Sequence, residues 1–451
     1  MRSLVSSAML LCLAAGALWI IPRSVRPAGG DSYEPLPAKF DLPAPEAEVS
    51  RWIQELDVRE MRRHGWLIFA ALTSPSHLRR EDADGALPIW ETWYSKEETM
   101  RPPGVPRHAV RPVFGFPPEE LAHTGPSKRV VSVGARIFFN KDARDHVQKN
   151  CLYLENKLEC LLHKPLEAGR DGKPTPREVP DFPRPSVTLK TSWMHISQSK
   201  CTPVPVWDGK PLDPPSLSNG PSEWERKVWV YAPAVLPASC PQGERVPLDA
   251  FYHLKITTME EVASWKSSGN VIVDPAAGDF AIGDYVVLVG FHAATREIPN
   301  WVWTTFWWHD RPDDGPFGSD RAAAVRGVWR HYLMDVAYDM DRPWEHDTSP
   351  KVTFNPYLEG GLTEGVHANC MTCHRRAARP DGTKVITDYS PDPVEPKQLV
   401  VRGAAAAVAT YLPDFDQRLK LHFVWTLANP IAPPSGSPPA GCACSDTSQR
   451  K

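Results

Sequence analysis

Residues 301–310 read WVWTTFWWHD, a run with large apolar side chains at odd and even positions alike. In a β-strand successive side chains point to opposite faces, so three tryptophans fall on one face, while Val302, Phe306 and Trp308 fall on the other. A strand with one face in water alternates apolar and polar residues, whereas a strand buried on both faces does not. We therefore expect this run to be a central strand of a sandwich or a barrel.

The run has a hairpin partner just before it in the chain. Asp284–His292 is a second apolar run, and the connection Ala293–Asn300 between the two contains a proline. Composition and alternation predict further strands at Pro88–Tyr94, Tyr153–Leu162, Val187–Met194, Val228–Tyr231 and Val246–Ile256. Together these patterns predict a β-rich domain at residues 46–318.

Apolar residues at helical spacing predict several helices. They are Glu46–Arg63, Asn140–Asn150, Ala322–Met340, Leu399–Leu412 and Asp414–Ala428. The last three follow the strand-rich part of the chain, so the sequence predicts an α+β protein. In this prediction, a sandwich or barrel-like domain precedes a small helical domain at residues 319–429.

The helical domain contains the sequence CMTCH at residues 370–374, a C-x-x-C-H motif. Cys370 and Cys373 are three residues apart, so on one helical turn both thiols can form thioethers with the vinyl groups of a haem. The adjacent His374 is then directed at the iron as its proximal ligand. The motif predicts one covalently bound haem c.

Two other kinds of site contain a C-x-x-C pair, and the surroundings disfavour both. A zinc site needs further Cys or His ligands at a suitable distance, but the later cysteines, Cys442 and Cys444, have a C-x-C spacing in a Pro- and Ser-rich tail. A thioredoxin-like redox pair usually opens a helix after a strand, whereas residues 358–362 before this motif contain two glycines.

Length and charge narrow the classes of partner. The 451 residues allow two or more domains, and they carry a formal net charge of -3. No basic excess suggests nucleic acid as a partner. We expect either a redox partner protein or a small-molecule substrate.

The first 28 residues resemble an export signal, because an apolar run from Leu4 to Ile21 lies between arginines. We expect a cleaved signal peptide, with the bulk of the chain outside the cytoplasm. The alternative is an uncleaved N-terminal anchor, since the run is nearly long enough to span a bilayer, and membrane association is expected only in that case. A linker at 29–45 and a disordered tail at 430–451 complete the predicted organisation.

The cysteines agree with export from the cytoplasm. Besides Cys12 and the motif pair, six of the nine cysteines remain, and an even number in an exported chain suggests disulfides. Cys151 and Cys160 bracket a segment predicted as a hairpin, so we expect a bridge between them. The alternative is a pair of buried thiols.

Several stretches together resemble a widespread family of exported bacterial proteins that end in one c-type haem motif, the cytochrome c family proteins. The matching stretches are Glu91–Trp93, Leu189–Trp193, Val289–His292, Trp301–Phe306, Asn369–His374 and Phe423–Trp425. The resemblance implies a periplasmic cytochrome-like protein and brings no established substrate. In similar proteins Glu-His follows the Thr-Phe pair, whereas here Trp307 and Trp308 intervene before His309, so no role is carried over to that histidine.

The sixth iron ligand is left open by the sequence. Electron carriers usually close the iron with Met or His, but no methionine follows His374. The candidates are His292, His309, His331, His422, Met334 and Met340. His292 is the preferred distal ligand, because it closes an apolar strand and lies in a stretch shared with the resembling family; the other possibility is an open site.

Three functions follow from these alternatives. A closed iron site favours electron transfer by a mono-haem c-type cytochrome, which is the main prediction. An open site favours a haem-dependent oxidoreductase that acts on peroxide or an organic substrate. A ligand sensor is the third possibility, in which haem ligation is relayed to the β-rich domain.

Overall fold

The computed structural model describes residues 33–79, 85–105, 134–168, 174–209, 221, 224–267, 277–338, 353–359, 370–374, 377–379, 418–430 and 441–443. Ser32–Lys451 forms one compact unit. The predicted signal segment, the helix predicted at Leu399–Leu412, and Cys444 lie outside the described residues. Among the helices that are described, none combines the length and the apolar character needed to cross a bilayer.

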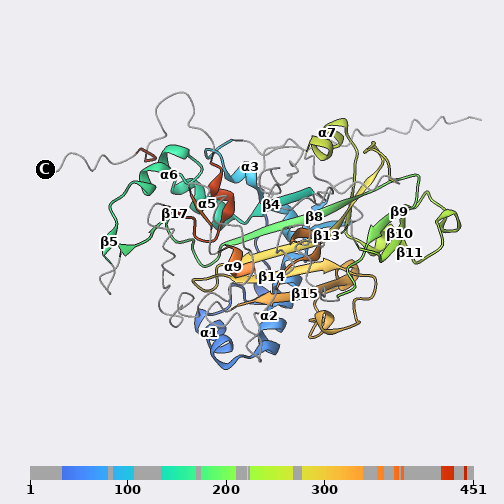
Figure 1. The fold of residues 1–451 in the computed structure, drawn as a ribbon, viewed down its shortest axis with the longest axis horizontal. Coiled ribbons are helices and arrows are strands. Elements are labelled where there is room, and N and C mark those ends of the chain that lie inside the picture. The colour runs from blue at the N-terminus through green and yellow to red at the C-terminus, as the bar shows by residue number, and fades with distance from the viewer. Residues whose placement is uncertain are drawn as a thin grey trace, which may run out of the picture. The chain divides into compact units, whose positions relative to one another are not determined.

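A seven-stranded sheet forms the centre of this unit (Figure 1). Its strands are β3 (Tyr94–Ser95), β4 (Gly134–Phe139), β8 (Val187–Ile196), β12 (His253–Lys255), β13 (Tyr285–Thr295), β14 (Val302–Trp308) and β15 (Tyr332–Ala337). The order is β15-β14-β13-β8-β4-β3, and β12 pairs with the first part of β13. Every pairing in this sheet is antiparallel.

Smaller elements surround the central sheet. The helices are α1 (Glu46–Glu55), α2 (Val58–Leu72), α3 (Lys96–Thr99), α5 (Lys141–Lys149), α6 (Glu155–Leu162), α7 (Met259–Ser267), α8 (Pro356–Glu359) and α9 (Cys370–His374). The minor strands are β1 (Pro75–Arg79), β2 (Ala86–Pro88), β5 (Glu167–Ala168), β6 (Pro174–Thr175), β7 (Arg177–Glu178), β9 (Thr202–Pro205), β10 (Lys227–Tyr231), β11 (Arg245–Pro247), β16 (Ala378–Arg379) and β17 (Leu419–Lys420). Short 3-10 turns include η2 (Ile89–Thr92), η6 (Pro316–Gly318), η7 (Gly327–His331) and η11 (Trp425–Ala428).

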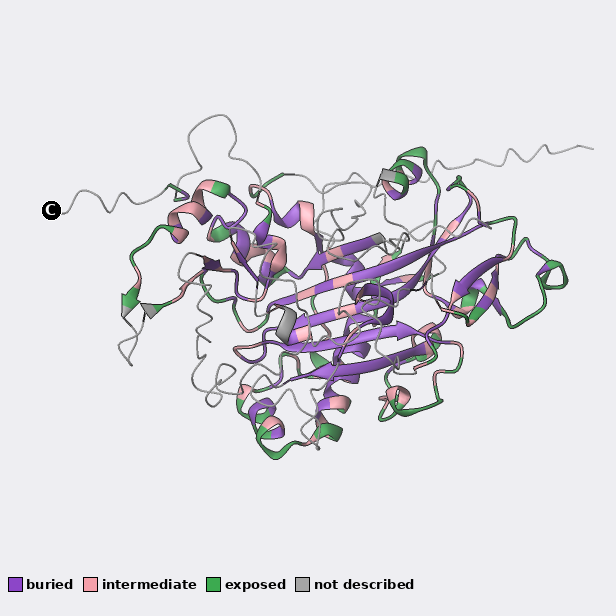
Figure 2. Ribbon diagram, viewed as in Figure 1, coloured by how far each residue is buried: buried purple, intermediate pink, exposed green. Residues whose placement is uncertain are grey.

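The hairpin predicted from the tryptophan-rich run is confirmed. β13 and β14 pair from Gly290 opposite Trp307 to Thr295 opposite Val302. β14 lies between β13 and β15, and every one of its residues is buried. The central strands are correspondingly the most continuously buried part of the ribbon in Figure 2. Apolar residues on both faces therefore indicated an interior strand correctly.

Helix α2 covers one face of this sheet. Asp57 caps the helix by accepting a hydrogen bond from the backbone N–H of Glu60 at 3.1 Å. Further along, Gly65 lies so close to β15 that a Cβ atom at this position would be 2.7 Å from Cγ1 of Val336 and 3.4 Å from Sδ of Met334. The lack of a side chain at Gly65 lets helix and sheet approach. We call this side of the sheet the helix face.

The opposite side carries the motif, and we call it the site face. Residues paired across antiparallel strands point to the same side, so Trp303 shares the site face with its partners Ala294 and Ala337. His292 lies one paired row away, opposite Thr305. In Figure 1 α9 crosses in front of β13 and β14, whereas α2 lies behind them.

Several secondary-structure predictions were wrong. Ala322–Met340 is not a helix, because its second half forms β15, and a short apolar run cannot be assigned to helix or strand from periodicity alone. Tyr153–Leu162 contains α6 rather than a strand; Leu154, Leu158 and Leu161 have the helical spacing.

Other segments also differ from the prediction. Pro88–Tyr94 is mainly the η2 turn, and the described part of Asp414–Ala428 contains β17 and η11. Glu46–Arg63 is helical but divides at Leu56, whose backbone is left-handed. The central sheet is open, so it is not the closed barrel that was one of the two predicted architectures. Since β15 belongs to this sheet, the strands continue past the predicted domain boundary at residue 318.

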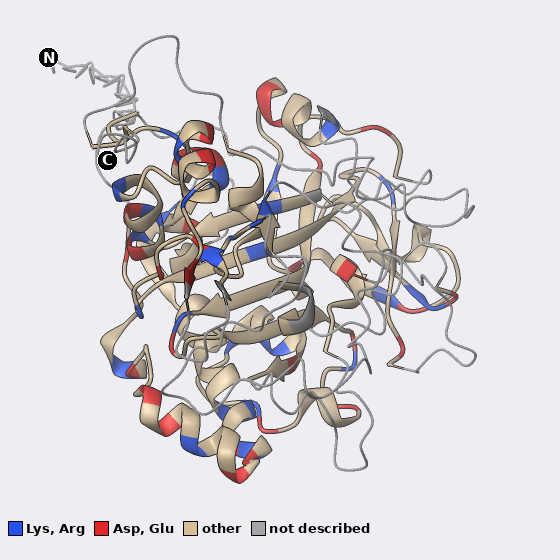
Figure 3. Ribbon diagram, turned by 60° about the vertical axis from the view of Figure 1, so that its left-hand side comes forward, with Lys and Arg blue, Asp and Glu red and all other residues tan. Residues whose placement is uncertain are grey.

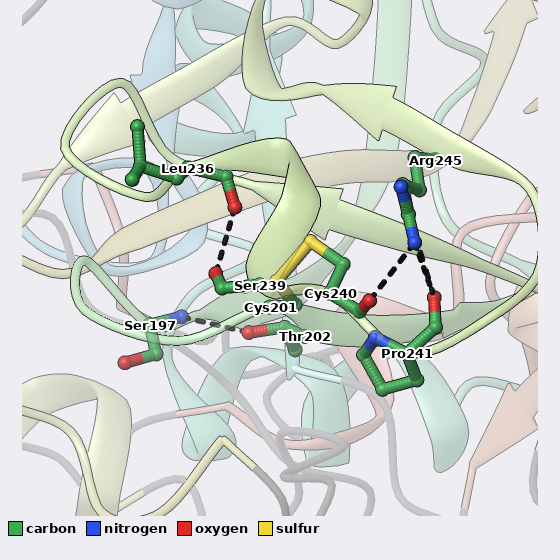
Figure 4. The surroundings of a disulfide bond; sticks show 8 residues. All are labelled: Ser197, Cys201, Thr202, Leu236, Ser239, Cys240, Pro241 and Arg245. Atoms are coloured by element: carbon green, nitrogen blue, oxygen red, sulfur yellow. Dashed lines mark hydrogen bonds between the residues drawn. A yellow bond between two sulfur atoms is a disulfide. The ribbon is translucent and has the colours of Figure 1, made fainter.

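Two disulfides lie among the described residues. Cys201 is bonded to Cys240 and joins the start of β9 to the turn before β11, where Arg245 donates to the carbonyl of Cys240 at 3.1 Å (Figure 4). Cys151 is bonded to Cys442, with 5.6 Å between their Cα atoms. The predicted Cys151–Cys160 bridge is therefore wrong, because the segment between these cysteines is helical rather than a closed hairpin. Cys160 is itself disulfide-bonded.

A buried polar network holds the ends of β13 and β15 against α2. The carboxylate of Glu297 is fully buried; it accepts from the N–H of Ala44 at 2.6 Å and from the hydroxyl of Thr295 at 2.7 Å. Its Oε1 lies 3.3 Å from Nε2 of His64, whose Nδ1 contacts the hydroxyl of Tyr338 at 2.7 Å. Burial alone would raise the pKa of Glu297, but His64 and these donors outweigh it and lower the pKa below 4.5.

Replacing this carboxylate should change the pH dependence of stability. Because the folded pKa of Glu297 is lowered, its contribution is complete above pH 4.5 and is lost as the pH falls through the folded pKa. Glu297→Gln should cost about 1–3 kcal/mol near neutral pH and flatten the acid dependence of the unfolding free energy. Urea denaturation from neutral pH to below pH 4.5 measures both effects. The exposed variant Glu260→Gln is the control, and an unchanged acid slope in Glu297→Gln would contradict the assignment.

Candidate functional site

The C-x-x-C-H motif lies on the short helix α9 above the site face. The backbone N–H of Cys370 donates to the carbonyl of Thr353 at 3.2 Å, and Cys370 keeps its thiol. Met371 is buried and anchors the helix in an apolar cluster that also contains Trp303. The helix brings positions 370 and 373 to one side, as thioether formation with one haem requires; the side chain of Cys373 itself is not described.

The imidazole of His374 has two well-defined neighbours. Its Nδ1 is 2.8 Å from the carbonyl oxygen of Phe423, so Nδ1 carries the proton and donates it to that oxygen. The indole of Trp303 lies against the ring, with 4.3 Å between the ring centroids. Within the described part of the chain, no residue hydrogen-bonds to Nε2 of His374. The Nε2 lone pair is therefore available to a metal.

A strained turn supplies the carbonyl that orients His374. His422 and Phe423 have φ values of 50 and 69 degrees, in the left-handed region that side chains other than glycine rarely adopt. Backbone hydrogen bonds join the turn to the segment after the motif. The N–H of Leu421 donates to the carbonyl of Ala377 at 2.8 Å, and the N–H of Ala377 donates to the carbonyl of His374 at 3.0 Å. Left-handed residues cost of order 1 kcal/mol each and cluster at functional sites.

These features fit a haem-binding histidine. Burial lowers the pKa of His374 to about 4, so the ring is neutral near neutral pH, as a metal ligand must be. Metal-binding histidines almost always donate their second N–H to a carbonyl or carboxylate, which is the role of Phe423 here. The residues present could hold a c-type haem through Cys370, Cys373 and His374; when bound, the haem supplies a one-electron iron couple.

A second histidine lies beside the first on the site face. Nε2 of His292 is 2.7 and 2.9 Å from the two carboxylate oxygens of Glu359 on α8. Lys190 pairs with His292 across β8 and β13, and all three groups act electrostatically on His374. Figure 3 shows few charged positions along the central strands. Burial opposes ionisation of Glu359, but His292, Lys190 and the N–H of Asn355 outweigh it and lower its pKa.

The preferred distal ligand is thus near the motif but already occupied by a partner. His292 pairs with Thr305, which is two residues along β14 from Trp303. Two residues span about 7 Å of a strand. Its Nε2 could bind iron only after releasing Glu359, while its Nδ1 has no hydrogen-bond partner among the described residues. The structure therefore brings the two predicted histidines together without choosing between a closed and an open iron site.

The other candidate ligands are less suitable. Met334 pairs with Phe306 and contacts α2, so it lies on the helix face, away from His374. Both ring nitrogens of His422 are engaged, one by the indole N–H of Trp301 and the other by Asp181, each at 3.2 Å.

Two further histidines are too distant to be ligands. His309 follows β14 at the end opposite Trp303, six residues or about 20 Å along the strand. His331 lies beside it, because the N–H of His309 donates to the carbonyl of His331 at 2.8 Å. Met340 lies outside the described residues.

The hydrogen bonds of Asn355 hold α8 in place over β13 and β14. Its Nδ2 donates to Oγ1 of Thr305 at 3.0 Å and to the carbonyl of Phe306 at 2.7 Å. Its N–H donates to Glu359 at 2.6 Å. A Cβ atom on Gly290 would be 2.8 Å from Oδ1 of Asn355, so the glycine gives the amide its space.

Removing this amide should loosen α8 from the sheet. Asn355 is fully buried, and Asn355→Ala leaves the groups that it pairs with unsatisfied, at a cost of about 1–3 kcal/mol. Urea denaturation measures the change in unfolding free energy. The exposed Asn429→Ala is the matched control and should stay within about 0.5 kcal/mol of wild type. Equal stability of the two variants would show that Asn355 does not anchor α8.

Three parts of the site were not predicted from the sequence. Trp303 was expected only as a strand residue and as part of the resemblance, Phe423 only as part of the resemblance, and Glu359 had no predicted role. Phe423 acts through its backbone, which no side-chain pattern can reveal. Among the described residues, no group of three or more His, Cys, Asp or Glu side chains converges as a metal site, so no zinc-type cluster accompanies Cys370 there.

Comparison with known proteins adds no relative to this description. No protein family, no curated protein and no solved structure matches the chain. The geometry of the site is therefore the basis for any functional proposal.

Proposed function

We propose that this protein is an exported mono-haem c-type cytochrome that transfers electrons. Cys370 and Cys373 form the thioethers, and His374 is the proximal ligand. The observation that carries the proposal is the hydrogen bond from Nδ1 of His374 to Phe423, because it leaves Nε2 free and oriented. A C-x-x-C pair in a thiol-disulfide enzyme needs no such fixed histidine.

Two features support export from the cytoplasm. The bridges Cys151–Cys442 and Cys201–Cys240 are of a kind that persists in oxidising compartments. The apolar run before residue 22 is typical of an export signal. A periplasmic location also suits haem c, because its attachment takes place outside the cytoplasm. The expected partner there is a redox protein or a small molecule.

Covalent haem is the first test. Wild-type protein produced with cytochrome c maturation machinery should keep its haem through acid-acetone extraction, because thioether bonds resist it. Cys373→Ala should lower the yield of haem protein sharply, whereas Thr372→Ser, which leaves C-x-x-C-H intact, should not. Haem staining after denaturing electrophoresis and mass spectrometry measure both results. Wild-type protein without haem would refute the proposal.

A haem-dependent oxidoreductase with an open iron site is the second candidate. The specific observation in its favour is that His292 already binds Glu359, while Met334, His422, His309 and His331 are engaged or misplaced. The hydrogen-bonded pair of His292 and Glu359 would then lie beside an exchangeable iron position. Peroxide and organic substrates are the expected classes of reactant.

Spectroscopy of one variant separates the two candidates. If His292 closes the iron, wild-type protein should be low-spin and slow to bind carbon monoxide, and His292→Ala should become high-spin and bind it rapidly. Met334→Leu is the control, because Met334 lies on the helix face, and it should leave the spectrum unchanged. A wild-type protein that is already high-spin and binds carbon monoxide at once favours the oxidoreductase.

A further inference from the structure

The first three turns of α2 form one wall of a pocket that is separate from the motif. The pocket has a volume of about 420 Å³ and is lined by Arg59, Arg63, Leu67, Asp320, Arg321, Ala322 and Ala323. Arg59, Arg63 and Leu67 are four residues apart, so they form a single stripe along the helix. The segment from 320 to 323 forms the other wall. Small-molecule sites are typically of this size.

The second wall is fixed before any ligand binds. Arg62 directly precedes Arg63 in α2 and lies beside the lining stripe. It donates to the carbonyls of Pro316, Phe317 and Ser319 at 3.0 to 3.3 Å. The indole N–H of Trp66 also donates to Ser319, at 2.9 Å. Because these bonds hold the loop against α2, the pocket need not be ordered at the cost of binding energy.

Positive charge dominates the lining. Three of its side chains are arginines, and Asp320 is the single acid among them. Asp320 is shared between Nε of Arg59 at 3.8 Å and Nε of Arg62 at 3.5 Å. Arg62 is therefore occupied by this carboxylate and by four backbone carbonyls, the fourth being that of Met334 at 3.3 Å. Arg59 shares the same carboxylate through the longer contact.

Arg321 is the buried member of this group. Its side chain is 5% exposed and lies over the indole of Trp66, with 5.3 Å to the ring centroid. Its Nη2 donates to the carbonyls of Pro312 and Tyr332 at 2.6 and 3.2 Å, and its Nη1 contacts Asp313. Its Nε has no hydrogen-bond partner among the described residues, an arrangement that is costly unless something else accepts from it.

The remaining acids do not cancel this charge. Glu60 pairs with Arg63 at 2.9 Å and Asp313 pairs with Arg321 at 2.5 Å, but neither acid lines the pocket. The Glu60–Arg63 pair is solvent-exposed on both sides, and exposed pairs contribute about 0–1 kcal/mol. A phosphate or carboxylate held in two-point contact with a guanidinium forms stronger, charge-assisted bonds, so an anion can displace such a partner.

We infer that this pocket binds a small polyanion with two or more phosphate or carboxylate groups. Arg59 and Arg63 bind the outer groups, since their side chains are 77% and 57% exposed and free to turn toward a ligand. Arg321 fixes the inner group, and Leu67 with the two alanines contacts the carbon skeleton of an organic anion. The inference is independent of haem binding and concerns the opposite face of the sheet.

Calorimetry on the full-length protein tests this inference, with inorganic pyrophosphate and citrate as separate probes. Wild-type protein should bind at least one probe with one-to-one stoichiometry. The double variant Arg59→Gln with Arg63→Gln should weaken binding at least about tenfold, the factor equivalent to about 1.4 kcal/mol. Both side chains are exposed, so the variant should fold normally, and circular dichroism checks this.

Arg51→Gln is the control for the loss of an exposed arginine elsewhere, because Arg51 pairs with Glu55 on α1 at 2.9 Å and does not line the pocket. This variant should retain wild-type affinity. Two results would overturn the inference. One is that the wild type shows no saturable binding of either probe, and the other is that the double variant and Arg51→Gln lose equal affinity. The second result would indicate non-specific attraction to positive charge.

Discussion

Burial of the β13–β14 hairpin on both faces is the constraint on which the structure depends. Phe306 and Val302 are fully buried on the helix face, and Trp307 is fully buried on the site face. Fully burying one such aliphatic or phenyl side chain contributes roughly 1.5–3 kcal/mol. Both faces must therefore be covered, and the chain covers them with segments distant in sequence. α2 comes from the N-terminal part, and α8 and α9 come from the C-terminal part.

This double cover explains how the motif acquires a defined environment. A five-residue helix such as α9 has little stability of its own, because isolated short helices are marginal in water. It is held by the burial of Met371 and by the bond from Cys370 to Thr353. The sheet thus acts as a rigid platform for His374, and Trp303 provides the surface against which the imidazole rests.

The turn at His422 and Phe423 shows where the fold accepts strain. Two successive left-handed residues without glycine are unfavourable, yet they aim a backbone carbonyl at Nδ1 of His374. The indole N–H of Trp301 and the carboxylate of Asp181 hold His422 in this conformation. The surrounding contacts therefore offset the local cost, which is the usual pattern when strained backbone serves a site.

The sequence by itself determined the motif, the interior hairpin and the presence of disulfides, because each depends on short spacing, alternation or composition. Tertiary structure decided which cysteines pair, since Cys151 and Cys442 are 291 residues apart. It also decided the partner of His374, a carbonyl 49 residues away, and that of His292, a carboxylate 67 residues away. The assignment of β15 depended on tertiary structure as well, because the same apolar run satisfies a helix or a buried strand until β14 lies beside it. Local patterns constrain conformation over a few residues, whereas long-range contacts are selected by the joint packing of the whole core.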